Sequence, residues 1–176
     1  GIQFDSQYSF INLSYSLKAV SVGGTIGDAG LEGYNFGLPT LNCEPYGLNF
    51  MGFYTETSSG IRVLETTPVK ELLNFADGDG VIVLYAQYSV AAPILQNGFE
   101  KVKTVEYNEN DIKFFNISPL DFSNNQAGIL NYSYKWFKAG STEVIATSNY
   151  LSLKNVLDSG KYSCSIVAEH QVWGKS

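Results

Sequence analysis

Short runs of β-branched and aromatic residues, separated by turn-forming residues, recur along this chain of 176 residues. The clearest run covers residues 81–88 and follows the turn sequence Asp-Gly-Asp-Gly at 77–80. Such runs predict β-strands, because these side chains pack well on a pleated surface. Further strands are predicted at residues 8–22, 48–55, 101–107, 111–117, 132–138, 143–146, 150–153 and 161–168. The pattern therefore predicts a mainly β protein.

Two segments of the first half depart from this pattern. Residues 23–37 are rich in glycine, and each glycine inside a helix costs about 1 kcal/mol relative to alanine. Turns or a bulged strand are therefore expected there, and not a helix. Residues 67–75 instead predict a short helix with Thr67 as its N-cap and Pro68 at its first position. The apolar face of this helix would consist of Val69, Leu72, Leu73 and Phe75.

The two halves of the chain differ in charge. Residues 1–89 carry three basic and nine acidic residues, whereas residues 90–176 carry eight of each, so the net charge of −6 belongs to the first half. Pro93 lies near the change in charge and would end a central strand there. These features predict two domains, at residues 1–90 and 91–176.

The composition disfavours several kinds of partner and chemistry. A net charge of −6 without a cluster of Lys or Arg disfavours nucleic acid and anionic membranes. No apolar run approaches the ~20 residues that cross a bilayer, and no signal peptide is expected at the amino terminus. The single histidine excludes a multi-histidine zinc site and a second imidazole base. We therefore expect no catalytic residue, no metal, no cofactor and no enzymatic activity.

Three candidate sites are expected to be structural. Cys43 and Cys164 fall in different predicted domains, so we expect two buried free thiols and not a disulfide. His170 is expected in a loop away from Cys164, which leaves no Cys–His pair for nucleophilic catalysis. Residues 77–80 predict a turn and not a calcium loop, because the following strand supplies no further oxygen ligands.

Two blocks of the first half occur in the order of a known repeat. Residues 46–55 read Tyr-Gly-Leu-Asn-Phe-Met-Gly-Phe-Tyr-Thr, and residues 84–88 read Leu-Tyr-Ala-Gln-Tyr. These blocks resemble those of the Listeria–Bacteroides repeat, the B-repeat of internalin-type surface proteins, with phenylalanine at position 53 where the family has Trp. The residues that carry the resemblance are Phe50, Gly52, Phe53, Tyr54, Leu84 and Tyr85. It is best over residues 38–88 and implies a β-grasp-like α+β module without catalytic residues.

The apolar residues of these blocks are also expected to pack in a core. Each contributes about 1.5–3 kcal/mol if it is buried. Those expected to share one buried sheet face are Phe50, Phe53, Leu84 and Tyr85. Gly52 is expected to let a neighbouring chain or ring approach closely.

The second half carries the spaced residues Asp158, Gly160, Tyr162 and Cys164, preceded by Trp136. This pattern resembles the immunoglobulin-like domain, with Trp136 on strand C and Cys164 on strand F. The resemblance implies that Trp136 packs into the core and that the Tyr162 hydroxyl group bonds to upstream backbone. Strand B, expected at residues 111–116, contains no cysteine. A β-sandwich without the inter-sheet disulfide, held by aromatic packing, is therefore expected.

The last predicted strand of this domain, strand G, is a stub at most. It would lie within residues 171–175, and its shortness would leave an open sheet edge. Such an edge can accept a strand from a neighbouring molecule.

Together the resemblances imply an extracellular bacterial fragment, from the cell envelope or secreted, within a longer modular protein that has further domains. Its expected function is cell adhesion through an unknown protein or carbohydrate ligand. Loop residues that would suit such contacts are Tyr107, Asn108, Asn110, Asn124, Asn125 and Tyr132, although surface asparagines in turns more often serve turn chemistry. One alternative is a carbohydrate-binding accessory module of a secreted enzyme, which coplanar exposed aromatic rings would favour. The other is a structural spacer without a ligand.

Overall fold

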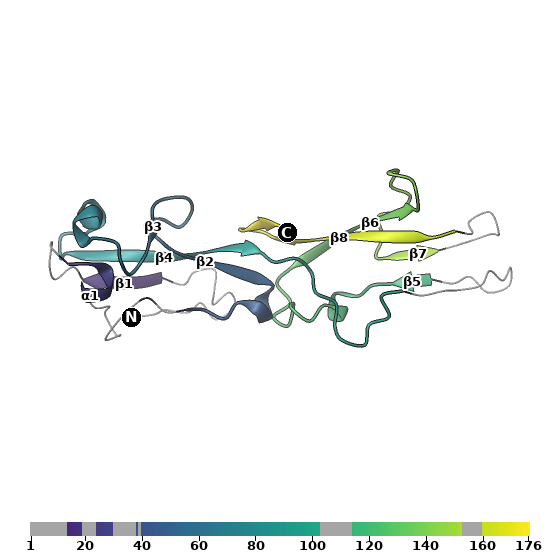
Figure 1. Ribbon diagram of the computed structural model, residues 1–176, viewed down its shortest axis with the longest axis horizontal. Coiled ribbons are helices and arrows are strands. Elements are labelled where there is room, and N and C mark those ends of the chain that lie inside the picture. The colour runs from purple at the N-terminus through teal and green to yellow at the C-terminus, as the bar shows by residue number, and fades with distance from the viewer. Residues whose placement is uncertain (1–13, 19–23, 30–37, 39, 103–113, 153–159) are drawn as a thin grey trace. The chain divides into compact units, whose positions relative to one another are not determined.

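The computed structural model describes residues 14–18, 24–29, 38, 40–102, 114–152 and 160–176. Over these residues the chain is mainly β, with antiparallel strand pairing (Figure 1). The chain divides into two compact units. Unit 1 comprises Gly1–Cys43 and Asn49–Ser89, and unit 2 comprises Glu44–Leu48 and Val90–Ser176.

Unit 1 is built on a sheet of four strands in the order β1-β4-β2-β3 (Figure 1). The strands are β1 (Ser14–Lys18), β2 (Leu48–Tyr54), β3 (Arg62–Val63) and β4 (Val81–Val90). The register pairs β1 with β4 and β3 with β2 in antiparallel fashion. The strands predicted at residues 48–55 and 81–88 are thus confirmed. Of the strand predicted at residues 8–22, the part that the structure describes as a strand is β1.

The central strand β4 buries every second side chain, as the period of a half-buried strand requires. Its buried side chains in unit 1 are Ile82, Leu84, Ala86 and Tyr88. Tyr85 is only half-buried. The expectation that Leu84 and Tyr85 share one face is therefore wrong, because consecutive residues of a strand point to opposite faces.

In strand β2 the regular alternation of side chains between the two sheet faces is interrupted at Gly52. This glycine has a φ angle of +120°. Phe50 and Phe53 would lie on opposite faces of a regular strand. Their rings instead meet edge to face, with centroids 5.4 Å apart. A Cβ atom on Gly52 would lie 2.8 Å from Nε of Arg62. The close approach expected at this glycine is therefore made by the Arg62 side chain and not by a ring.

The glycine-rich segment contains one helical turn, α1 (Ile26–Ala29). The expectation of no helix at residues 23–37 is wrong for these four residues. The N–H groups of Ile26 and Gly27 donate to the carbonyl groups of Thr67 and Glu65, at 3.0 and 2.9 Å. These tertiary hydrogen bonds hold the turn despite the low helix propensity of glycine.

The helix predicted at residues 67–75 forms as a 3-10 helix, η2 (Val69–Phe75). Thr67 is not its N-cap, because Pro68 occupies that position and the Thr67 hydroxyl oxygen accepts the N–H of Leu64 at 2.9 Å. Val69 and Leu72 are buried, whereas Leu73 and Phe75 are exposed. A 3-10 helix has three residues per turn and so buries positions i and i+3 together.

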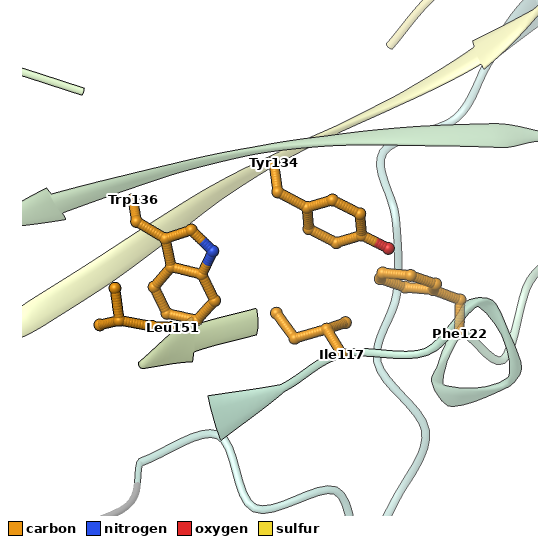
Figure 2. Packing of buried hydrophobic residues seen from close by; sticks show 5 residues of the cluster. All are labelled: Ile117, Phe122, Tyr134, Trp136 and Leu151. Atoms are coloured by element: carbon orange, nitrogen blue, oxygen red, sulfur yellow. The ribbon is translucent and has the colours of Figure 1, made fainter. Parts of the chain in front are cut away.

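Unit 2 contains two antiparallel sheets. One pairs β5 (Phe114–Asn116) with β7 (Tyr150–Ser152), and the other has the order β6-β8-β9. The strands of the second sheet are β6 (Asn131–Lys138), β8 (Tyr162–His170) and β9 (Gly174–Lys175). Both sheets contribute to one cluster of buried side chains, Ile117, Phe122, Tyr134, Trp136 and Leu151 (Figure 2). The two sheets therefore close on a common, aromatic-rich core.

These strands confirm most of the predictions for the second half. Strands β5 to β8 lie within or overlap the predicted segments, and the expected stub of a last strand is β9. Residues 143–146 are not a strand, since Ala146 makes only an isolated bridge to Trp136. Val144 and Ile145 are exposed. Burial of their side chains therefore does not stabilise a longer strand pairing there. Residues 103–107 of the strand predicted at 101–107 lie outside the described residues.

The segment Glu44–Leu48, which includes the 3-10 turn η1 (Glu44–Tyr46), is held inside unit 2 by backbone hydrogen bonds. The N–H of Ala91 donates to the Gly47 carbonyl at 2.9 Å, and the N–H of Ala127 donates to the Pro45 carbonyl at 3.0 Å. Gly47 has a φ angle of +66°, and a Cβ atom there would collide with the Leu130 side chain. Unit 2 therefore depends on residues that precede the predicted boundary at 90/91.

We predict that Gly47→Ala destabilises unit 2 by about 2–4 kcal/mol, because it adds a left-handed backbone penalty to overpacking. Gly128→Ala is the matched control, since Gly128 has a similar φ angle of +68° but open space around its Cβ position. The control is expected to lose only about 1 kcal/mol. Urea unfolding of the three proteins measures both values, and equal losses would contradict the packing described at Gly47.

Candidate functional site

Among the described residues of the immunoglobulin-like signature, Trp136 is the most deeply buried. It is 4 % exposed, and its indole N–H donates to the Ser148 carbonyl at 2.9 Å. Its ring meets Phe115 of the opposite sheet nearly edge on, with centroids 5.8 Å apart. The pairing register places Cys164 directly across from Trp136 on β8. The expectation that Trp136 packs into the core is confirmed.

The signature residues Gly160 and Tyr162 lie just before and at the start of β8. A Cβ atom on Gly160 would lie 2.8 Å from Cε of Lys138, so this glycine makes room for the lysine stem. The Lys138 ammonium group lies 5.9 Å from the ring centroid of Tyr162, a cation–π contact. The hydrogen bond expected from the Tyr162 hydroxyl group stays a prediction. Asp158 lies outside the described residues.

Both thiols are free, as predicted, but the expectation that both are buried is wrong for Cys164, which is half-buried on β8. Cys43 is buried, and this burial raises its pKa to about 11. Burial also raises the pKa of Cys164, although a backbone hydrogen bond at Lys135 opposes the shift. Since the thiolate is the reactive form, both environments suppress nucleophilic chemistry at neutral pH.

His170 does not lie in a loop, and that expectation is wrong. It is the last residue of β8 and is 2 % exposed. Its Nδ1 atom accepts the N–H groups of Val172 and Trp173 at 3.0 and 3.3 Å. Burial lowers its pKa. The imidazole therefore accepts hydrogen bonds from the turn that follows it. Its Nδ1 atom is bonded to these backbone groups and not to the Cys164 thiol.

The Asp-Gly-Asp-Gly sequence at residues 77–80 forms a turn, as predicted. Oδ1 of Asp77 accepts the N–H groups of Asp79 and Val81 at 2.8 and 3.0 Å. The N–H of Gly80 donates to the Asp77 carbonyl at 3.0 Å, which closes the turn into β4. Nowhere in the described ranges do three or more His, Cys, Asp or Glu residues gather to hold a metal ion.

The polar residues expected to make loop contacts are placed differently. Asn124 is 2 % exposed, accepts the N–H of Ile94 at 3.1 Å and donates to the Ala92 carbonyl at 3.0 Å. Tyr132 is half-buried, and its ring stacks on Phe122. The expectation of a surface contact is therefore wrong for Asn124, which is buried, and the expected loop position is wrong for Tyr132, which lies in β6. Asn125 is half-buried, and Tyr107, Asn108 and Asn110 lie outside the described residues.

The sequence did not predict the structural roles of three residues that organise unit 2. They are Gly47, Asn124 and His170, each of which acts on backbone groups of a connecting segment. Turn-forming residue types occur at many positions of this chain. No local pattern therefore marks the positions at which such a side chain is buried.

Comparison of the chain with models of known protein families, with curated proteins and with solved structures gave no match. Within the described part of the chain, no helix has the length and apolar character needed to cross a bilayer. The candidate residues that the structure describes pack in a core, close a turn or form hydrogen bonds to backbone groups of connecting segments.

We predict that Asp77→Ala lowers the stability of unit 1 by about 1 kcal/mol, because two backbone N–H groups lose their acceptor. Asp77→Asn keeps an oxygen at this place and is the matched control, with a smaller expected loss. Thermal unfolding with and without added calcium measures both effects. A rise in the melting temperature with calcium would contradict the assignment of this loop as a turn.

We predict that Cys43 reacts with a thiol reagent at pH 8 at least about 100-fold more slowly in the folded chain than after unfolding. The reason is its pKa of about 11 and its burial. The variant Cys164→Ser isolates this thiol, and Cys43→Ser isolates the other one. Rapid labelling of Cys43 in the folded variant would show that the site is open.

Proposed function

We propose that this chain is a non-catalytic module of a bacterial cell-surface or secreted protein that acts in cell adhesion. It binds a protein or carbohydrate ligand without covalent chemistry and belongs to a longer chain with further domains. The observation that carries the proposal is the core of unit 2. There Trp136 is buried between two sheets and lies across from Cys164 on the neighbouring strand.

An immunoglobulin-like sandwich accounts for the strand pairing of unit 2. In that fold strands B and E lie in one sheet, and strands C, F and G lie in the other. Taking β5 and β7 as strands B and E, and β6, β8 and β9 as strands C, F and G, gives the pairing of unit 2. The strand β5 carries no cysteine, so the aromatic core takes the place of the inter-sheet disulfide. Adhesion modules commonly use such sandwiches to present loops and edges.

A B-repeat-like β-grasp module is the corresponding proposal for unit 1. Phe53 and Leu84, one from each sequence block, are both fully buried in this unit. The rings of Phe50 and Tyr88 lie 6.1 Å apart, which links the two blocks across the sheet. The 3-10 helix η2 adds Val69 and Leu72 to the buried residues. The blocks thus form one packed unit, as a structural signature would.

A carbohydrate-binding accessory module receives less support from the described surface. Sugars stack on exposed aromatic rings, which a platform must present side by side on one face. In the described part of the chain, the exposed aromatic side chains are Phe75 and Tyr150. These two residues belong to different units, so neither unit presents a described pair of exposed rings.

The test is binding of the whole chain to arrays of glycans and of host-matrix proteins, at two salt concentrations. We expect saturable binding to one ligand class. The exposed apolar residues Leu64 of unit 1 and Val144 of unit 2 offer matched surface variants, Leu64→Asp and Val144→Asp. A variant that loses binding at an unchanged melting temperature locates the surface. Absence of binding by the folded chain would contradict adhesion and favour a structural spacer.

A further inference from the structure

The hairpin that ends unit 2 is closed by an unusual acceptor, the imidazole of His170. Strands β8 and β9 pair at two positions, Glu169 with Lys175 and His170 with Gly174. In the turn between them, the N–H groups of Val172 and Trp173 both donate to Nδ1 of His170. The side chain therefore satisfies two N–H groups of its own turn.

One further contact holds the hairpin beyond β9. The N–H of Ser176 donates to the Ala168 carbonyl at 2.8 Å, and the N–H of Ala168 donates to the Ser176 hydroxyl oxygen at 3.0 Å. With only two paired residues in β9, the hairpin has few hydrogen bonds to replace those made by the imidazole. Loss of the Nδ1 acceptor would therefore lower the stability of the whole hairpin.

Protonation removes this acceptor. Nδ1 accepts N–H groups only through its lone pair, so the neutral ring carries its proton on Nε2. A proton taken from solvent would bind Nδ1 and turn it into a donor that faces two N–H groups. The resulting imidazolium would also be buried, since His170 is 2 % exposed. Both effects favour the open hairpin, in which the ring reaches water.

The groups around His170 offer no compensating negative charge among the residues described. Tyr132 lies across from Ala168 on the same sheet face, and burial raises its pKa to about 12, so it is neutral. Glu169 and Lys175 form the neighbouring pair, and adjacent residues of a strand point to the opposite face. The pKa of His170 is lowered by burial and by no charged neighbour.

We propose that His170 is a pH-sensitive latch, which holds the β8–β9 hairpin closed when neutral and releases it when protonated. Release would uncover the backbone edge of β8 at its carboxyl end, where β9 is now paired. This device is independent of the proposed adhesive function. Since the chain has a single histidine, its effect can be read without interference from another imidazole.

The sign of the pH dependence follows from the two states of the ring. In the open hairpin the imidazole is solvated, with a pKa near the ordinary value of 6.5, whereas in the closed hairpin burial lowers the pKa. The closed form is therefore favoured above pH 6.5 and is weakened as the pH falls below it. Between pH 7.5 and pH 5 we expect opening to increase by up to about 30-fold.

The test combines a titration with hydrogen exchange on the whole chain. A proton NMR titration of the imidazole is expected to give a pKa below 6.5. The protection factors of the Val172, Trp173 and Ser176 amides are expected to fall between pH 7.5 and pH 5. Those of amides in the middle of β6 are expected to stay unchanged over this range.

The matched variant is His170→Asn, which keeps an acceptor near the position of Nδ1 but does not titrate. Its hairpin protection is expected to be independent of pH over the same range. Three results would overturn the latch: a titration at or above 6.5 in the natural chain, an equal loss of protection in β6 and the hairpin, or the same pH dependence in the variant. The titration of the natural chain decides the question even where the variant fails to fold.

Discussion

The structure of unit 2 depends on the indole ring of Trp136. Its N–H donates to the Ser148 carbonyl, and its ring makes an edge-to-face contact with Phe115 of the other sheet. The backbone of the same residue pairs with Ala146. One side chain thus ties β6 to the connection that precedes β7 and to β5. Both thiols are free, so the two sheets are joined by aromatic burial and not by a disulfide.

The connecting segments are fixed by a few buried polar groups. Asn124 holds the chain after β4 with two hydrogen bonds, and Gly47 accepts the N–H of Ala91 where no larger residue would fit. Such groups are costly to bury unless each is satisfied. Their arrangement explains why a fragment cut at the predicted boundary would lack part of unit 2.

Most of the strands could be predicted because their signal is local. A run of β-branched and aromatic residues marks β4, and aromatic residues mark β6. The turn at Asp77 was also predictable, since its carboxylate bonds to backbone only two and four residues away.

The helical turn α1 was not predictable, because the carbonyl groups that hold it lie about forty residues away along the chain. The burial of His170 was missed for a related reason, since a short hairpin places it on the core face. A ligand site for the proposed adhesive function could not be predicted from the sequence, because ligand contacts leave no comparable local pattern.

Aromatic contact across their core joins the two sheets of unit 2. A double-mutant cycle of Phe115→Leu and Trp136→Leu, followed by urea unfolding, tests it most directly, because these rings come from opposite sheets. The edge-to-face geometry predicts a coupling free energy of about 0.5–1.5 kcal/mol. Strictly additive losses would contradict the claim, since they would mean that the two rings do not stabilise each other in the folded chain.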